Sequence, residues 1–342
     1  MTLDTIEEPK TVKLPSVFMV SSGRSGTTLL ASMLNATDQI YIPYESDFIA
    51  RAYPAFGNRT DLNNSDYAHI ARMFRRAAKE SGWGMPVEEV EAHLETKQPR
   101  TFAQVNAAIY QLFHQREKTE DLKWGIKAPV LIASLDRIHR TCPQAKIVHV
   151  VRDGRDVYLS YKRVHDTSAI KFGPKSVVEN ALYWVDGLRR VAEFTQSCPD
   201  CTVYELTYND ILESPTSTLQ QLCDFLEIEY KPSMHENFND FERNKKVAPK
   251  VFRESIHKKL HSGLDSKNTQ KYLTAMTPWQ LFQFELIAAP YLQKYGYSLK
   301  YQWLGWKLFS PVRWGAHFLA RQFNDWRYAK RDREVFNKEL QP

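Results

Sequence analysis

The chain has 342 residues, of which 43% are hydrophobic, so it is long enough for one large α/β domain or two small ones. Its formal net charge is +6, which favours an anionic ligand or partner. No nucleic-acid recognition motif is present, so we expect no nucleic-acid partner. Four cysteines are too few for a disulfide scaffold.

The first predicted element is a strand over about Val17–Ser21, an apolar run that leads into the turn Gly23-Arg-Ser-Gly-Thr-Thr28. A helix is predicted from Gly26 to Asn35. Glycines in such a turn let backbone N–H groups curl around an anion, and the helix N-terminus adds partial positive charge. The turn lacks the Lys that follows the last glycine of a Walker A loop. Its cation is Arg24, so the unit suits one phosphate with a second charged group beside it.

The segments that follow alternate between strand and helix patterns, which indicates a parallel sheet covered by helices. Further strands are predicted at Ile40–Tyr44, Trp124–Ala128, Lys146–Val151 and Thr202–Leu206. Helices are predicted for three parts of Asp66–Lys118, after Pro129, for Ser176–Ser197 and near Pro215–Leu226. Residues 231–275 are polar and aperiodic, and we expect them to form a loop that closes on a ligand.

A second phosphate-type motif lies in Lys146-Ile-Val-His-Val-Val-Arg-Asp-Gly-Arg-Asp-Val-Tyr-Leu-Ser-Tyr-Lys162. A buried-type strand runs into Arg152, and Ser160 lies two turns into the helix that follows. A guanidinium suits bidentate contact with a phosphate dianion. Ligands of parallel α/β sheets bind beyond the carboxyl ends of the strands, so we expect both motifs at one edge of the sheet.

These two motifs resemble those of the sulfotransferases that use 3′-phosphoadenosine-5′-phosphosulfate (PAPS), nearest to the tyrosylprotein and bacterial branch. The resemblance covers roughly residues 15–298. It implies an α/β fold with a P-loop-like central parallel sheet flanked by helices and a helical acceptor-facing insertion. It also implies sulfuryl transfer from PAPS to an acceptor hydroxyl, with 3′-phosphoadenosine-5′-phosphate (PAP) as product and no metal. The implied cofactor contacts are Arg24, Ser25, Gly26, Thr27, Thr28, Arg152, Ser160 and Tyr208.

The same resemblance implies a catalytic set of Glu45, Arg24, Lys127 and Ser255. Glu45 follows the second strand, and we expect it to be the base that takes the proton of the acceptor, with Asp47 as its local competitor. Arg24 and Lys127 are expected to hold the sulfuryl group. His114 lies on an amphipathic helix, where a core or surface role is expected.

Two other functions stay open. A kinase-like phosphotransferase is one, although the missing Walker Lys argues against it. A non-enzymatic nucleotide-binding or membrane-surface module is the other, although the pair Glu45 and Lys127 argues against it. The acceptor is open among a lipid, a carbohydrate and a tyrosyl or phenolic hydroxyl.

The N-terminal residues 1–14 are polar and acidic, and we expect them to be flexible. They show no signal peptide and no membrane anchor, which together with the resemblance predicts a cytoplasmic bacterial enzyme. The segment Cys198-Pro-Asp-Cys201 lacks the second pair that a zinc site needs. We therefore expect these two cysteines to be structural and reduced.

Residues 299–342 are predicted to form a basic, Trp-rich helical tail. Ala316, Leu319, Phe323 and Trp326 fall on one helical face. This pattern is typical of a helix that lies on an anionic membrane, which would bring the protein to the inner face of that membrane. Packing of the tail on its own domain, or on a second subunit of a homodimer, explains the same pattern.

Overall fold

The computed structural model describes residues 14–78, 83–168, 171–238, 264–265, 268–302 and 309–339. Its centre is a five-stranded parallel sheet with the strand order β2-β3-β1-β4-β5. The strands are β1 (Val17–Val20), β2 (Ile40–Tyr41), β3 (Lys123–Lys127), β4 (Lys146–Val151) and β5 (Val203–Thr207). The predicted α/β fold with a central parallel sheet is confirmed.

The central strands β1 and β4 are almost fully buried, which explains why they are the most apolar strands of the sheet. In β1 every residue is buried, and successive side chains point to opposite faces. Phe18 and Val20 join one hydrophobic cluster, whereas Val17 and Met19 join another. The turn after β1 is therefore held by a strand that has no free face.

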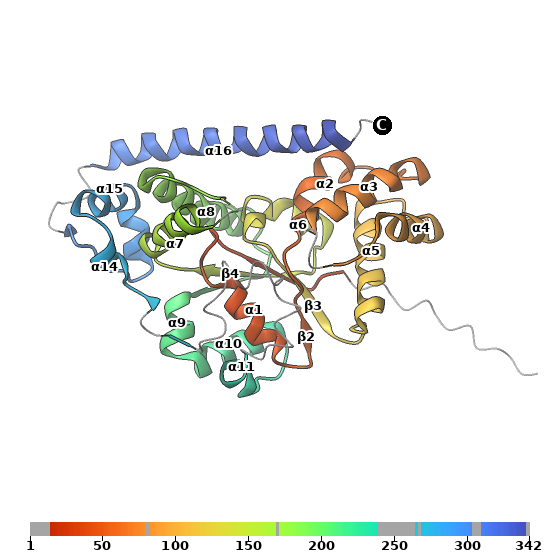
Figure 1. Ribbon diagram of the computed structural model, residues 1–342, viewed down its shortest axis with the longest axis horizontal. Helices are drawn as coiled ribbons and strands as arrows, with labels where there is room; N and C mark the ends of the chain where they lie inside the picture. Colours follow the sequence, from red (N-terminus) through yellow and green to blue (C-terminus); the bar gives the residue numbers. More distant parts are fainter. Residues whose placement is uncertain are drawn as a thin grey trace, which may run out of the picture.

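Helices cover both faces of the sheet (Figure 1). One face carries α1 (Thr27–Asn35), α9 (Tyr208–Glu213), α10 (Pro215–Leu226) and α11 (Ser233–Glu236). The other carries η1 (Pro129–Ala133), α6 (Leu135–Thr141), α7 (Gly154–Thr167), α8 (Val177–Ser197), α14 (Tyr272–Ala275) and α15 (Pro278–Lys294). On the first face, Met19 packs in one cluster with Leu30 and Leu219.

A helical insertion separates β2 from β3. It contains α2 (Phe48–Phe56), α3 (Asn64–Ala77), α4 (Val87–Lys97) and α5 (Phe102–Glu117). The last three are the helices predicted within Asp66–Lys118, and capping boxes at Asn63 and Thr101 begin α3 and α5. The helix α2 was not predicted, because it is short and has Pro54 inside it.

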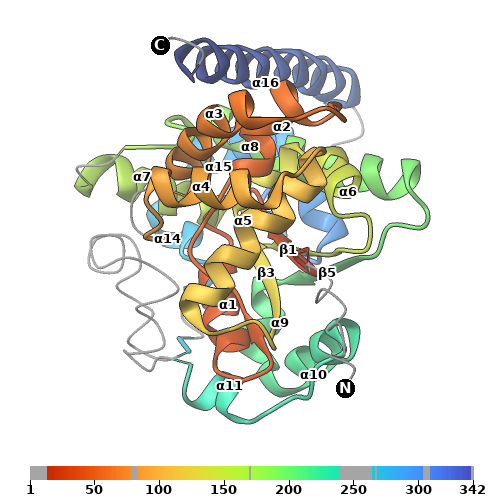
Figure 2. The same cartoon turned by 90° about the vertical axis from the view of Figure 1, so that its right-hand side faces the viewer.

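The long helix α16 (Ser310–Glu339) forms the outermost layer of the molecule in both views (Figures 1 and 2). It contacts α8 and α15 on one half of the molecule and α2 and α3 of the insertion on the other. The predicted helical tail thus packs on its own domain along much of its length.

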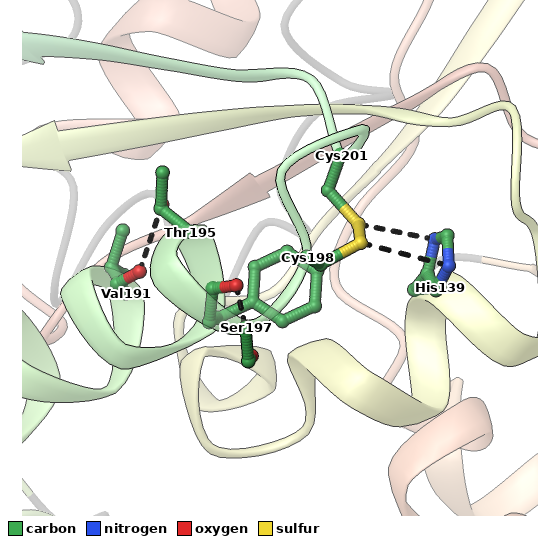
Figure 3. The surroundings of a disulfide bond; sticks show 7 residues. His139, Val191, Thr195, Ser197, Cys198 and Cys201 are labelled. Carbon is green, nitrogen blue, oxygen red and sulfur yellow. Dashed lines mark hydrogen bonds between the residues drawn. A yellow bond between two sulfur atoms is a disulfide. The ribbon is translucent and has the colours of Figure 1, made fainter.

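The expectation that Cys198 and Cys201 are reduced is wrong, because the structure joins them in a disulfide (Figure 3). The helix α8 ends at Ser197, and the turn that follows brings the two Cα atoms to 5.3 Å, a normal separation for a disulfide. His139 of α6 lies beside both sulfurs, with Nδ1 3.3 Å from Cys201 Sγ. His139 and the two sulfurs lie within 4.8 Å of one another, but only reduced thiolates, not the disulfide, could bind a metal ion.

Candidate functional site

A cavity of about 850 Å³ lies at the carboxyl ends of the strands. Each of the five strands supplies a residue in its wall or directly behind it: Arg24 after β1, Glu45 after β2, Lys127 at the end of β3, Arg152 after β4 and Tyr208 after β5. Residues far apart in the sequence meet there because parallel strands end at one edge of the sheet.

The turn between β1 and α1 has an unusual backbone. Gly23, Arg24 and Gly26 all have positive φ, and at Gly26 φ is 98°. A Cβ atom added to Gly26 would lie 2.4 Å from the Tyr208 ring, so only glycine fits there without a shift. The turn is thereby packed tightly against the residue that follows β5, and the N-terminus of α1 opens into the cavity.

An ion pair joins the ends of β2 and β3. Lys127 Nζ lies 2.9 Å from Glu45 Oε1 and donates a second hydrogen bond, 3.2 Å long, to Thr28 Oγ1. The Lys127 side chain is fully buried, whereas that of Glu45 is 19% exposed. Glu45 and Thr28 line the cavity, and Lys127 holds both of them from behind. The pair presents a carboxylate, the form that accepts a proton, next to the turn.

Arg152 is held from three sides. Its guanidinium donates to the Arg24 carbonyl (3.3 Å) and to the Asn268 carbonyl (2.7 Å), and it stacks on the Tyr208 ring with 4.4 Å to the centroid. Asn268 in turn donates to the Tyr208 hydroxyl at 2.7 Å. Arg152 Nε is buried and has no hydrogen-bond partner within the part of the chain that the structure describes. Buried donors rarely stay without an acceptor, so this atom is suited to a ligand.

Positive charge is concentrated around Arg24. Its Nε donates to Ser160 Oγ at 3.0 Å. Burial lowers the pKa of Arg24 below its usual value, and the nearby cations Arg163 and Arg152 act in the same direction, although Tyr161 opposes them. A bound anion would relieve this repulsion. The cavity is therefore electrostatically prepared for an anionic ligand.

Comparison with known proteins decides the family. The model of the sulfotransferase family matches residues 15–232, which is more than half of the chain. The chain belongs to the sulfotransferase family. An uncharacterized protein of Aquifex aeolicus (strain VF5) is 24% identical to this sulfotransferase over 285 residues. That alignment covers 82% of the chain but only 34% of the Aquifex protein, so the chain spans about a third of that relative's length.

Solved structures support the fold. The sulfotransferase domain from the curacin biosynthetic pathway matches with a TM-score of 0.57 and 20% identity, over 84% of this chain and 99% of that one. The sulfotransferase domain of the Synechococcus PCC 7002 olefin synthase matches with a TM-score of 0.54 and 19% identity, over 83% and 95% of the two chains. At these identities the likeness shows the shared fold alone.

Most of the residues predicted for the site line one cavity of this sulfotransferase: Arg24, Gly26, Thr27, Thr28, Glu45, Arg152, Ser160 and Tyr208. Ser25 is buried and donates to the Gly23 carbonyl instead, and Lys127 stands behind the wall. Ser255 lies outside the described residues. The competitor Asp47 is the residue at the N-cap position of α2 and pairs with Arg51 at 2.6 Å, and it does not line the cavity.

Sequence reasoning missed one wall of the cavity. Tyr161, Phe172 and Tyr183 line it and form an aromatic cluster, with ring centroids 6.1 Å and 6.4 Å from that of Tyr161. Tyr161 follows Ser160 directly, and that position was the available signal. Asn268 was also missed, because it lies in a segment with no periodic pattern.

Proposed function

We propose that this sulfotransferase moves the sulfuryl group of PAPS to a hydroxyl of its acceptor, with Glu45 as the base. The observation that carries the proposal is the contact between Glu45 and the buried Lys127 beside the glycine turn. Glu45 lines the same cavity as the phosphate-type turn and Arg152, which supports its assignment as the proton acceptor. A structural ion pair alone would not need that location.

The residues present fit the nucleotide. The tight turn at Gly26, the α1 N-terminus and the hydroxyls of Thr27 and Thr28 suit the 5′-phosphate. Ser160 and the free donor at Arg152 Nε suit the 3′-phosphate. We assign to Tyr208 the support of both groups, because its ring packs against Gly26 and Arg152.

When bound, PAPS supplies the sulfuryl group and the negative charge that the cavity must stabilise. Glu45 would accept the proton of the acceptor hydroxyl as that oxygen attacks the sulfur in line, while the bond between the sulfur and the 5′-phosphate oxygen breaks and PAP leaves. Arg24 stabilises charge on the transferred group from the turn, and Lys127 holds the Glu45 carboxylate and Thr28 in place. The aromatic wall of Tyr161, Phe172 and Tyr183 is the surface we assign to the acceptor.

Calorimetric titration with PAP, AMP and ATP tests the nucleotide assignment. We expect PAP to bind at least tenfold more tightly than AMP, because only PAP carries the 3′-phosphate that Arg152 and Ser160 would contact. Arg152→Met should remove this preference, whereas AMP binding should change little. Equal affinity for PAP and AMP would refute the 3′-phosphate assignment, and a preference for ATP would favour the kinase-like alternative.

Activity needs a separate test, because the acceptor is open among lipid, carbohydrate and phenolic classes. The protein is incubated with radiolabelled PAPS and a cell extract, which is then split into lipid, glycan and protein fractions. We expect label in one fraction and none with Glu45→Gln. Absence of label in every fraction, together with normal PAP binding, would contradict the proposed transfer.

A further inference from the structure

The helix α16 is oriented opposite to an ordinary surface helix. Its polar side faces the body of the protein, where Arg321 pairs with Asp186 (3.2 Å) and with Glu193 (2.9 Å) of α8. Asn324 donates to Asp186 at 3.1 Å, and His317 contacts the Ile287 carbonyl of α15 at 3.1 Å. Hydrogen bonds and ion pairs therefore fix which face of α16 points outward.

The outward face is apolar. Its large side chains are 49–71% exposed: Val312, Trp314, Phe318, Leu319, Phe323 and Trp326. Val312, Leu319, Phe323 and Trp326 lie at spacings of seven, four and three residues, which is one stripe of an α-helix. Trp314 stacks on Phe318 and Phe323 on Trp326, with centroids 5.7 Å and 5.9 Å apart. Six large apolar side chains exposed on one helix indicate an interaction surface.

The charge of α16 indicates the partner. The helix contains seven Lys or Arg residues and four Asp or Glu residues. Four of the basic residues come directly after Trp326, the last residue of the stripe, in the sequence: Arg327, Lys330, Arg331 and Arg333. Lys330 Nζ lies over the Trp326 ring at 5.3 Å. Tryptophan prefers the membrane interface, and each basic residue near an anionic surface contributes about 1 kcal/mol. A second copy would carry the same positive excess and would be repelled.

We propose that the outer face of α16 binds the surface of a bilayer that contains anionic lipids, with the helix parallel to that surface. No helix among the described residues is long and apolar enough to cross a membrane, and a charged amphipathic helix favours the interface. The stripe runs from Val312 to Trp326, about 21 Å along the helix axis, so it presents an extended contact.

The docked surface would lie one layer away from the cavity. Tyr328, from α16, is close enough to Tyr161 and Tyr183 to contribute to the raised pKa of both hydroxyls, although burial is the main cause. Those two tyrosines line the cavity. Tyr183 belongs to α8, which α16 contacts, so α16 lies next to a helix that carries part of the aromatic wall.

Vesicle co-sedimentation of the full chain tests the proposal. Phosphatidylcholine vesicles are compared with vesicles that also contain phosphatidylglycerol, at low and high salt. We expect binding to the anionic vesicles only, weakening as salt rises. The triple variant Trp314→Ser, Leu319→Ser, Phe323→Ser should bind at least tenfold less. Trp279→Ser is the matched control, since Trp279 is exposed to a similar degree on α15, and it should bind normally.

Two further measurements keep the outcome clear. Circular dichroism and PAP titration show whether the triple variant is folded. Brominated lipids should quench the Trp fluorescence of the wild type more strongly than that of the double variant Trp314→Phe/Trp326→Phe. Equal binding to both vesicle types, or unchanged binding by the triple variant, overturns the proposal. So does a dimer in sedimentation velocity that the triple variant abolishes, which would assign the face to a second copy.

Discussion

Glu45 and Asp47 are two carboxylates separated by one residue, and the structure gives them different surroundings. Glu45 lines the cavity and pairs with Lys127, whereas Asp47 stands at the start of α2 and pairs with Arg51. We expect Glu45→Gln to lower turnover on the order of a hundredfold or more, because the amide cannot accept a proton, while PAP affinity changes little. Steady-state kinetics and calorimetry measure this.

Asp47→Asn is the matched control for that prediction. It should keep nearly normal turnover, since Asp47 does not line the cavity. If Glu45→Gln retained normal turnover, the base would have to be another group or one on the acceptor.

His114 is buried in the insertion, and its Nδ1 lies 2.6 Å from Thr119 Oγ1. Burial lowers its pKa to about 4. Between about pH 6.5 and pH 4 the unfolded chain binds a proton at His114 and the folded chain does not. The free energy of unfolding therefore falls as the pH falls through this range. The full effect is at most about 3 kcal/mol.

Urea denaturation at pH 7.5 and pH 5 of the wild type and of His114→Gln tests this. We expect the free energy of unfolding of the wild type to fall more between the two pH values than that of the variant. Equal losses in the two proteins would show that His114 does not titrate in this way.

At the scale of elements, segments with their own local signals were predicted well. The bounds of β4 and α10 match the prediction, and Ser176 is the N-cap of α8 with a capping box to Glu179. The predicted ends of β1 and β4 also put Arg24 and Arg152 at one edge of the sheet. Parallel topology alone is sufficient for that inference.

Contacts between distant segments could not be predicted in this way. The strand expected at Ile40–Tyr44 pairs with β3 only at Ile40 and Tyr41, and the chain then leaves the sheet and carries Glu45 to the cavity. The aromatic wall and Asn268 depend on tertiary packing, which leaves no periodic trace in the sequence.

The turn that joins β1 to α1 yields a further prediction. Gly26→Ala adds a Cβ that would approach the Tyr208 ring to 2.4 Å, at a φ of 98°. We expect PAP affinity to fall about tenfold or more and stability to fall by about 1–3 kcal/mol. Calorimetry and thermal unfolding measure the two effects.

Gly84→Ala is the control that separates backbone strain from a steric clash of the added Cβ. Gly84 also has a positive φ, of 55°, but nothing lies within 4 Å of an added Cβ. It should lose stability without losing PAP affinity. A similar loss of affinity in both variants would contradict the role of the Gly26 contact.

At the scale of the whole molecule, Asp186 joins two layers. Its carboxylate accepts hydrogen bonds from Arg190, Arg321 and Asn324, of which the last two belong to α16, and it is 6% exposed. We expect Asp186→Asn to reduce the free energy of unfolding by about 1–3 kcal/mol and to make α16 more accessible to limited proteolysis. PAP affinity should stay normal, since Asp186 does not line the cavity.

Asp325→Asn is the milder control, because Asp325 also pairs with Arg190 and Arg321 but is about half exposed. It should reduce the free energy of unfolding by less than Asp186→Asn does. An equal or larger reduction would show that the exposed ion pairs of Asp325 contribute more to stability than the buried hydrogen bonds of Asp186.

The central position of β1 has a consequence for amide hydrogen exchange. The amides of β1 are fully buried and the strand is paired on both sides, so they should exchange with deuterium only when the whole sheet opens. The edge strands β2 and β5, and the peripheral helices, should exchange through smaller openings. Because the glycine turn is attached to β1, it should be among the last parts of this edge of the sheet to unfold. Opening of the edge strand β5 would instead move Tyr208 away from Gly26 and Arg152, so we expect that opening to weaken nucleotide binding while β1 stays intact.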